Sequence, residues 1–246
     1  MTTHAFFDPF GAFAADRQGR RECRNMQEQF AADDAAPSRA RSARRSLSYR
    51  DLLGDAWPRL PAATRARFER HDALYTGTMT LGATAAGRWV ARLCKLVGSP
   101  LPPASSQPLA ATVRVATDHA TGGSRWTRCY DFPGRRVSVA SVKALDADGA
   151  LVERLSCGLR MRLTLDVRGE ALCFDSAGYY VEYEGVAWSG RRYGAWRLEL
   201  PSWFLPGRTC VTHSDLGDGR FRFTMTVRHA LLGDLFHHDG VFHSVE

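Results

Sequence analysis

From residue 109 to the C-terminus, hydrophobic residues recur at every second position. The clearest example is residues 159–167, where Leu, Met, Leu, Leu and Val alternate with polar residues, and residues 220–228 repeat the pattern. Strict alternation predicts β-strands that turn one face towards a core and the other towards water. Less regular alternation predicts eight further strands at residues 111–117, 124–130, 136–142, 151–155, 171–175, 178–184, 208–214 and 240–245.

Short turns rich in glycine and aspartate separate these strands, as at residues 121–123, 146–149 and 217–219. Turns of this length leave no room for helical crossovers, so neighbouring strands should pair antiparallel as a meander. A sheet of about ten half-buried strands is expected to curl into a barrel or half-barrel, because a flat sheet exposes edges that aggregate. The apolar face then points inward, onto a helix or towards a cavity.

The chain before residue 109 has helical spacing instead. Ser48 and Asp51 form a capping-box-like start for a first helix, which Pro58 ends. Pro61 suits the first position of a second helix, and a third helix carries its apolar residues along one face. The predicted elements are helices at residues 49–57, 62–71 and 85–97 and a short strand at residues 77–82. The sequence thus predicts an α+β fold in which N-terminal helices precede a curled antiparallel β-meander of about ten strands, packed on or around a helix.

Composition divides the chain into two segments. Residues 1–46 are rich in Arg and Ala and show no apolar period, which predicts a disordered tail. Residues 47–246 form the single predicted domain, a helical and β-barrel-like unit long enough to bury a core without disulfides or a metal. The first residues lack the basic start and apolar stretch of a signal peptide, and no apolar run is long enough to cross a bilayer. We therefore expect a cytoplasmic protein.

The formal net charge of +7 raises nucleic acid and anionic membranes as partners. Of the 33 basic residues, however, only Lys95 and Lys143 are lysines, and the charges are spread along the chain without a helix-turn-helix or RNA-binding strand pattern. We therefore do not expect nucleic-acid binding, and membrane contact remains only as an alternative for one loop. The six cysteines include no Cys-x-x-Cys pair, which argues against a zinc or redox site.

A series of short motifs follows one order along the chain. The motifs are Tyr49-Arg-Asp-Leu-Leu-Gly-Asp-Ala-Trp57, Trp126-Thr-Arg-Cys-Tyr130, Leu151-Val-Glu-Arg154, Leu200-Pro-Ser-Trp-Phe-Leu-Pro206 and Asp218-Gly-Arg-Phe-Arg-Phe223. In order and spacing they resemble the bacterial domain of unknown function 4166 family over residues 49–243. The resemblance implies no particular activity. Members of that family also occur fused to oxidoreductase-type domains, so the resemblance implies an accessory role beside an oxidoreductase-type protein partner.

The sequence contains none of the motifs that carry well-defined chemistry. There is no Gly-x-Ser-x-Gly nucleophile motif and no Gly-x-Gly-x-x-Gly or other phosphate-binding loop. Histidines and aspartates gather at residues 229–243, but their spacing matches no zinc site, and an exposed strand end accounts for them. We therefore predict no catalytic residue, no metal and no cofactor.

Two charged residues interrupt the apolar faces of predicted strands. Arg128 lies between Trp126 and Tyr130, and Glu153 lies in the same way between two leucines. Alternation directs both charges inward, where an unpaired charge costs several kcal/mol. They should therefore either form a buried ion pair that fixes the strand register or face a ligand. The loop at residues 201–206 holds Trp203 between two prolines, which suits a plug, a lid over a cavity or a membrane-dipping tip.

These observations leave three hypotheses open. The first is a non-catalytic binding module that holds a hydrophobic or lipid-like small molecule inside the curled sheet. The second is an accessory enzyme, associated with an oxidoreductase, in which His71, Arg128 and Glu153 converge. The third is a packed scaffold whose tail recruits partners. The candidate ligand-binding residues are His71, Trp126, Arg128, Tyr130, Glu153 and Trp203.

Overall fold

The computed structural model describes residues 46–96, 101–155, 158–183, 185–188, 191–201 and 205–245. The predicted tail at residues 1–46 therefore lies outside the described residues, apart from Ser46. The helices are α2 (Tyr49–Leu53), the 3-10 helix η1 (Gly54–Arg59), α3 (Ala62–Glu69) and α4 (Ala85–Leu96). The first seven strands are β1 (Ala73–Ala83), β2 (Leu109–Asp118), β3 (Gly123–Phe132), β4 (Arg135–Leu145), β5 (Leu151–Arg154), β6 (Leu159–Arg168) and β7 (Ala171–Tyr183). The later strands are β8 (Val186–Trp188), β9 (Arg191–Tyr193), β10 (Trp196–Glu199), β11 (Arg208–Gly217), β12 (Arg220–His229) and β13 (Gly233–Ser244).

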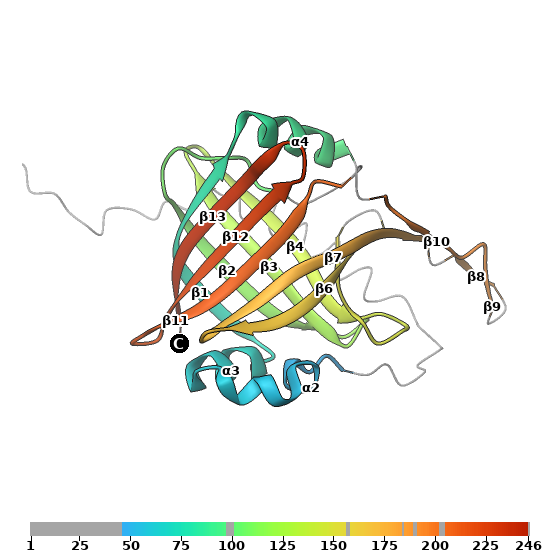
Figure 1. Cartoon of the computed structure of the whole chain (residues 1–246), viewed down its shortest axis with the longest axis horizontal. Helices are drawn as coiled ribbons and strands as arrows, with labels where there is room; N and C mark the ends of the chain where they lie inside the picture. The colour runs from blue at the N-terminus through green and yellow to red at the C-terminus, as the bar shows by residue number, and fades with distance from the viewer. Residues whose placement is uncertain are drawn as a thin grey trace, which may run out of the picture.

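Ten of these strands close into an antiparallel barrel (Figure 1). Strands β1 to β7 pair with their neighbours in chain order, β7 then pairs with β11, and β13 pairs back with β1. The predicted curled antiparallel sheet is therefore confirmed as a closed barrel. Closure pairs both edges of the sheet, which removes the exposed edges that the sequence argument identified as a liability.

The barrel departs from the predicted meander in two places. Predicted strands 171–175 and 178–184 are one strand, β7, because Gly178 adopts a φ of 137° at a register shift in the β6–β7 pairing and lets the strand continue. Between β7 and β11 the chain also leaves the ring, forms the separate β8–β9 hairpin and returns as β10 beside the second half of β7. The meander is therefore interrupted once.

The predicted short strand at residues 77–82 is in fact the eleven-residue strand β1, which completes the ring. Glycine makes its position possible, because a Cβ on Gly77 would lie 2.0 Å from the carbonyl oxygen of Val241 on β13. Only a residue without a side chain allows the two backbones to approach so closely.

Helices cover the two ends of the barrel (Figure 1). We call the end covered by α2, η1 and α3 the closed end, and the end covered by α4 the open end. At the closed end, Tyr49, Trp57, Leu60 and Phe68 are buried in the same core as the inward residues of the strands. No helix among the described residues is long and apolar enough to cross a membrane.

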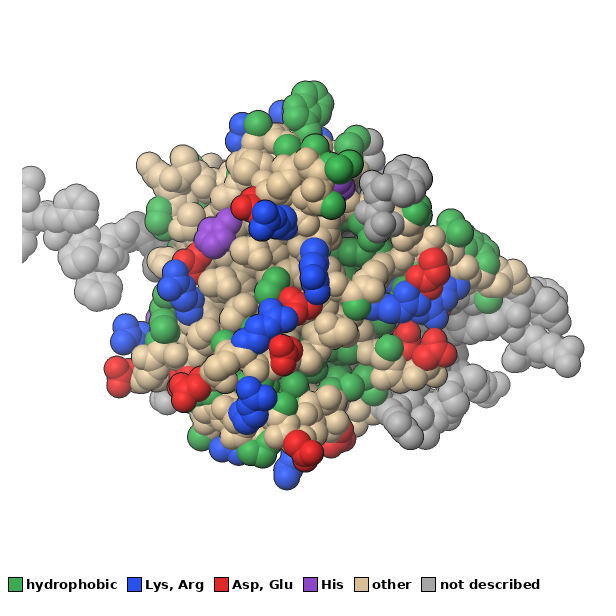
Figure 2. Space-filling view, in the orientation of Figure 1, with side chains coloured by type: hydrophobic (Ala, Val, Ile, Leu, Met, Phe, Trp, Pro, Cys, Tyr) green, Lys and Arg blue, Asp and Glu red, His purple; other side chains and the backbone are tan. Residues whose placement is uncertain are grey.

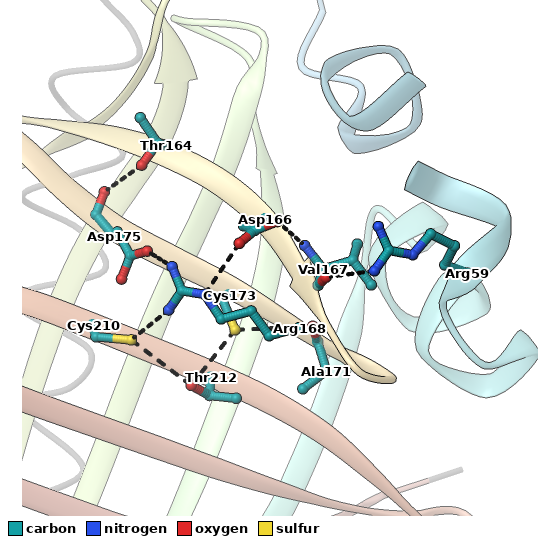
Figure 3. Close-up of polar contacts among 10 residues, drawn as sticks. All are labelled: Arg59, Thr164, Asp166, Val167, Arg168, Ala171, Cys173, Asp175, Cys210 and Thr212. Carbon is teal, nitrogen blue, oxygen red and sulfur yellow. Dashed lines mark hydrogen bonds and ion pairs between the residues drawn. The ribbon is translucent and has the colours of Figure 1, made fainter. Parts of the chain in front are cut away.

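Polar contacts on the outer wall hold the closed end together (Figure 3). Arg59 of η1 donates a hydrogen bond to the carbonyl oxygen of Val167, 3.1 Å away, which ties the helices to β6. The Arg168 guanidinium next to it forms ion pairs with Asp166 and with Asp175. These contacts fix the β6–β7 turn against the helices, and they lie outside the barrel rather than in its interior.

Candidate functional site

The barrel surrounds a cavity of about 730 Å³. Most of its wall is apolar and comes from inward-facing positions of the strands, where alternation places every second residue on the same face. Representative wall residues are Val139, Leu155, Met161, Val181, Val211 and Met225. The cavity is therefore a product of the same alternation that predicts the barrel.

The cavity reaches the surface at the open end. Leu93 of α4 and Leu231 and Leu232 of the β12–β13 turn line it, and they are 63%, 86% and 51% exposed. Hydrophobic side chains gather at this end of the molecule, whereas charged side chains are spread over the outer barrel wall (Figure 2). An apolar rim of this kind lets an apolar molecule enter without crossing a charged barrier.

A layer of aromatic side chains, which we call the aromatic floor, lies in the core beneath the cavity, and His213 is the member that lines the cavity. The Phe68 ring from α3 lies 5.2 Å from Tyr49, 5.1 Å from His213 and 6.1 Å from Trp126, measured between ring centroids. The first two contacts are edge-to-face, an arrangement that aromatic pairs favour. This layer separates the cavity from the closed end.

A charged cluster, formed by Arg128, Ser141, Lys143 and Glu153, lies against this floor. One carboxylate oxygen, Glu153 Oε1, accepts a hydrogen bond from Ser141 Oγ at 2.5 Å and lies 3.4 Å from Lys143 Nζ. The same oxygen lies 4.0 Å from Arg128 Nη2. Strand register brings these residues together, because Lys143 on β4 is directly opposite Glu153 on β5 and β3 lies on the other side of β4.

The cluster is buried, and burial controls its electrostatics. Burial alone would raise the pKa of Glu153, but Lys143 and Arg128 together with the Ser141 hydrogen bond lower it below its usual value. Burial lowers the pKa of Lys143 to about 8, although Glu153 opposes the change. At neutral pH, Glu153 is therefore ionised and Lys143 is mostly protonated.

Two neutral histidines also line the cavity. Burial lowers the pKa of His213 well below its usual value, and nearby cations lower it further. Burial likewise lowers the pKa of His238 to about 4. The buried Nδ1 atom of His213 has no hydrogen-bond partner among the described residues. Both rings can therefore contact a ligand as neutral groups.

The family of the chain can now be stated. A family model described as "Domain of unknown function (DUF4166)" matches residues 60–242. The chain belongs to the DUF4166 family. This match confirms the resemblance drawn from the sequence motifs, and it includes the whole charged cluster and every barrel strand except the last two residues of β13.

Curated proteins and solved structures provide two further comparisons. No curated protein matches the chain. Among solved structures, the chain is similar to the crystal structure of Rv2717c from M. tuberculosis, with 11% sequence identity and a TM-score of 0.35. The likeness covers 76% of this chain and 99% of that one.

The structure brings together some of the predicted site residues of this DUF4166 chain. Arg128, Tyr130 and Glu153 line the cavity, whereas Trp126 does not line it and is buried in the core beside Phe68. His71 is exposed and does not line the cavity, so it does not converge with Arg128 and Glu153.

The loop predicted at residues 201–206 is described only in part. Trp203 lies outside the described residues. Leu205 and Pro206 at the end of this loop line the cavity, as does Leu200 just before it.

Two polar residues of the site, Lys143 and His213, were not predicted from the sequence. Lys143 lies one residue beyond the predicted strand 136–142, although it continues the inward series of Val139 and Ser141. His213 continues a similar series with Val211 on β11. Extending each alternation by one position would have found both residues.

The histidine-rich segment contains no metal site in the part of the chain that the structure describes. His238 points inward and lines the cavity, whereas His237 is exposed on the opposite face of β13. Alternation along the strand separates these neighbouring histidines and prevents them from binding one ion together.

Proposed function

We propose that the barrel binds a hydrophobic or lipid-like small molecule without transforming it. The observation that carries this proposal is the cavity of about 730 Å³ with an apolar wall and a single charged cluster. Binding sites for small molecules have this size and composition, with apolar walls and a few polar groups that fix orientation. The apolar rim at the open end supplies a route of entry.

The cavity also favours binding over the packed scaffold. Protein interiors are close-packed, and a large unfilled space removes dispersion contacts from every side chain that lines it. A scaffold would gain stability by filling its barrel with larger side chains. The wall of this barrel instead keeps medium-sized residues such as Val139, Val211 and Met225 around an open centre.

Catalysis receives no support from the arrangement of the candidate residues. The enzyme hypothesis requires His71 within hydrogen-bonding reach of the same pocket as Arg128 and Glu153. His71 is exposed and lies outside the cavity lining. We therefore limit the proposal to binding.

The proposal is tested by filling the cavity from within. Met225 on β12 lines the cavity, and its neighbour Thr226 is exposed on the outer face. Native mass spectrometry should show a bound small molecule in the purified full-length chain. After extraction with an apolar resin, the chain should bind the neutral fluorescent probe N-phenyl-1-naphthylamine.

Met225→Trp should abolish or strongly weaken probe binding, because the indole occupies the ligand volume, whereas Thr226→Trp should leave it unchanged. Both variants must retain the far-UV circular dichroism of the parent chain. Absence of probe binding by the extracted parent chain, or equal binding by the two variants, would contradict the proposal.

A further inference from the structure

The charged cluster contains one carboxylate for two cations. Among the described residues that line the cavity, Glu153 is the only acidic side chain, whereas Arg128 and Lys143 are both cationic. The lining histidines cannot supply a negative charge. Two cations less one carboxylate leave the cluster with an excess positive charge at neutral pH.

Water does little to compensate this excess. Lys143 and Glu153 are 5% and 8% exposed, and Arg128 is mostly buried. The positive charge also acts on His213. Burial lowers the pKa of this histidine, and the cations Arg67 and Lys143 lower it further. An uncompensated buried charge is costly, and an anion that binds beside it removes that cost.

The two cations also have unused capacity to donate hydrogen bonds. Within the described part of the chain, the acceptors near them are Ser141 Oγ, 3.2 Å from Arg128 Nη1, and the single Glu153 oxygen. An ammonium has three N–H donors and a guanidinium has five. One hydroxyl and one carboxylate oxygen cannot accept from all of these donors, and both side chains line the cavity.

We infer that the natural ligand carries one anionic group, a carboxylate, which Lys143 and Arg128 bind at the floor while its apolar body lies along the wall towards the open end. This inference rests on the proposed function and specifies its ligand class as monocarboxylate amphiphiles. Glu153 balances one of the two cations and competes with the ligand carboxylate for them. Ser141 in turn holds the Glu153 carboxylate.

The inference is tested with ligands that differ only in their head group. Dodecanoate, dodecanol and dodecyltrimethylammonium each have a straight saturated chain of twelve carbons, counting the carboxyl carbon of dodecanoate, and can compete with N-phenyl-1-naphthylamine for the extracted full-length protein. Hydrogen bonds to charged groups in buried sites correspond to affinity differences of about tenfold or more. Dodecanoate should therefore bind at least about tenfold more tightly than dodecanol, and the cationic amphiphile should bind most weakly.

The outcomes separate this inference from the proposed function. If dodecanol and dodecanoate bind equally well, the barrel is a cavity for apolar molecules and the anionic head group is wrong. If neither ligand and no probe binds, the proposed function itself fails.

Substitutions in the cluster should shift the ratio of dodecanoate to dodecanol affinity in opposite directions. Lys143→Met removes a cation with little change of shape and should reduce the ratio about tenfold. Glu153→Gln removes the competing carboxylate, keeps an acceptor for Ser141 and should increase the ratio. Arg114→Met, on the exposed face of β2, controls for overall charge and should leave the ratio unchanged.

A purely structural ion pair predicts a different result. In that case both cluster variants would change stability but leave the affinity ratio at the parent value, which would overturn the inference. If Glu153→Gln does not fold, the Lys143→Met variant alone still tests the inference. In that variant Arg128 and Glu153 remain paired with each other.

Binding of dodecanoate should also depend on pH through Lys143. The groups packed around the cluster are Arg128 on β3, Glu153 on β5, His213 on β11, His238 on β13, Tyr179 on β7 and Tyr49 on α2. Burial raises the pKa values of the two tyrosines and lowers those of the two histidines, so these four side chains stay neutral between pH 7 and 9. Lys143, with a pKa of about 8 in the free protein, loses its proton in this range.

Because a bound carboxylate favours the protonated amine, dodecanoate affinity should fall about tenfold from pH 7 to pH 9. Dodecanol affinity should stay constant over the same range. An equal pH dependence for both ligands, or none for dodecanoate, would contradict the role of Lys143.

Discussion

At the closed end of the barrel, aromatic side chains from helices and strands fill the interior, whereas at the open end the same strands surround an unfilled space. Phe68 of α3 contacts Tyr49, Trp126, Phe174 and His213 within one layer. Helix α4 instead packs through a small separate cluster around Val227, Leu235 and Phe236, and keeps other apolar residues exposed.

This contrast separates two requirements within one sheet. Dense packing at the closed end buries enough apolar surface to stabilise the fold, at about 25 cal/mol for each Å² removed from water. The open end contributes less burial and so can hold a cavity and a rim. The charged cluster lies at the boundary, where its buried cations contact the aromatic floor: Lys143 Nζ lies 5.0 Å from the Trp126 ring centroid.

The largest expected effect is at the closed end. Phe68→Ala should lower the free energy of unfolding by about 3 to 5 kcal/mol, because it leaves a cavity in a rigid aromatic layer. Leu93→Ala at the open end should change it by less than about 0.5 kcal/mol, because Leu93 is largely exposed. Urea unfolding measured by circular dichroism gives both values. Similar losses of unfolding free energy in the two variants would show that the closed end is not packed more densely than the open end.

Glu153 should rank next. Among the described residues that line the cavity, Glu153 is the only carboxylate facing Arg128 and Lys143. Glu153→Ala leaves these buried cations unpaired, which should lower the free energy of unfolding by about 3 to 5 kcal/mol. Glu199 offers a matched control, because it pairs with Arg162 at 2.6 Å on the surface. Glu199→Ala should cost no more than about 1 kcal/mol. A small loss for Glu153→Ala in urea unfolding would mean that water reaches the cluster.

Alternation along the strands predicted a large part of this arrangement. It placed Arg128 and Glu153 on the interior face, and the structure brings Arg128 Nη2 within 4.0 Å of Glu153 Oε1. The inference succeeded because the side-chain face of a residue depends only on its own strand, and the two strands flank the same neighbour, β4. Local pattern was sufficient for these two residues.

The remaining features depend on long-range pairing, which local pattern does not encode. The closure of β7 onto β11 brings His213 over the floor, and nothing near His213 in the sequence indicates that partner. Similarly, the sequence Ser-Ala-Gly at residues 176–178 is typical of a turn, but pairing with β6 on one side keeps β7 intact through it. The cavity volume depends on how all ten strands close. The alternating pattern is therefore compatible with a filled barrel and with a barrel that holds a cavity.

The two neutral histidines predict that acid weakens the barrel from its interior. Their folded pKa values are lowered, so below the unfolded value of about 6.5 the unfolded chain binds more protons and stability falls as pH falls. Each histidine should cost about 2 kcal/mol between pH 6.5 and 5. In urea unfolding series at different pH values, His213→Leu and His238→Leu should each remove about half of the combined loss of stability from the two histidines. An unchanged pH dependence in both variants would show that the rings reach water.

Helix α4 approaches the barrel closely through its backbone. The amide of Thr84 donates to the Leu235 carbonyl oxygen at 3.0 Å, and a Cβ on Gly87 would lie 2.1 Å from that same oxygen. Gly87→Ala must therefore shift the helix away from β13. Because the clash is with backbone, the helix preference of alanine, about 1 kcal/mol, offsets only part of its cost, and the free energy of unfolding should fall.

The rates of ligand exchange should respond more strongly than stability to this displacement. If α4 covers the mouth, Gly87→Ala should speed both association and dissociation of N-phenyl-1-naphthylamine in stopped-flow fluorescence, because the helix no longer lies as close to the rim. Arg92→Ala, on the exposed side of α4, provides the control and should leave both rates unchanged. Rates that are the same in Gly87→Ala and the parent chain would mean that ligands do not enter the cavity past α4.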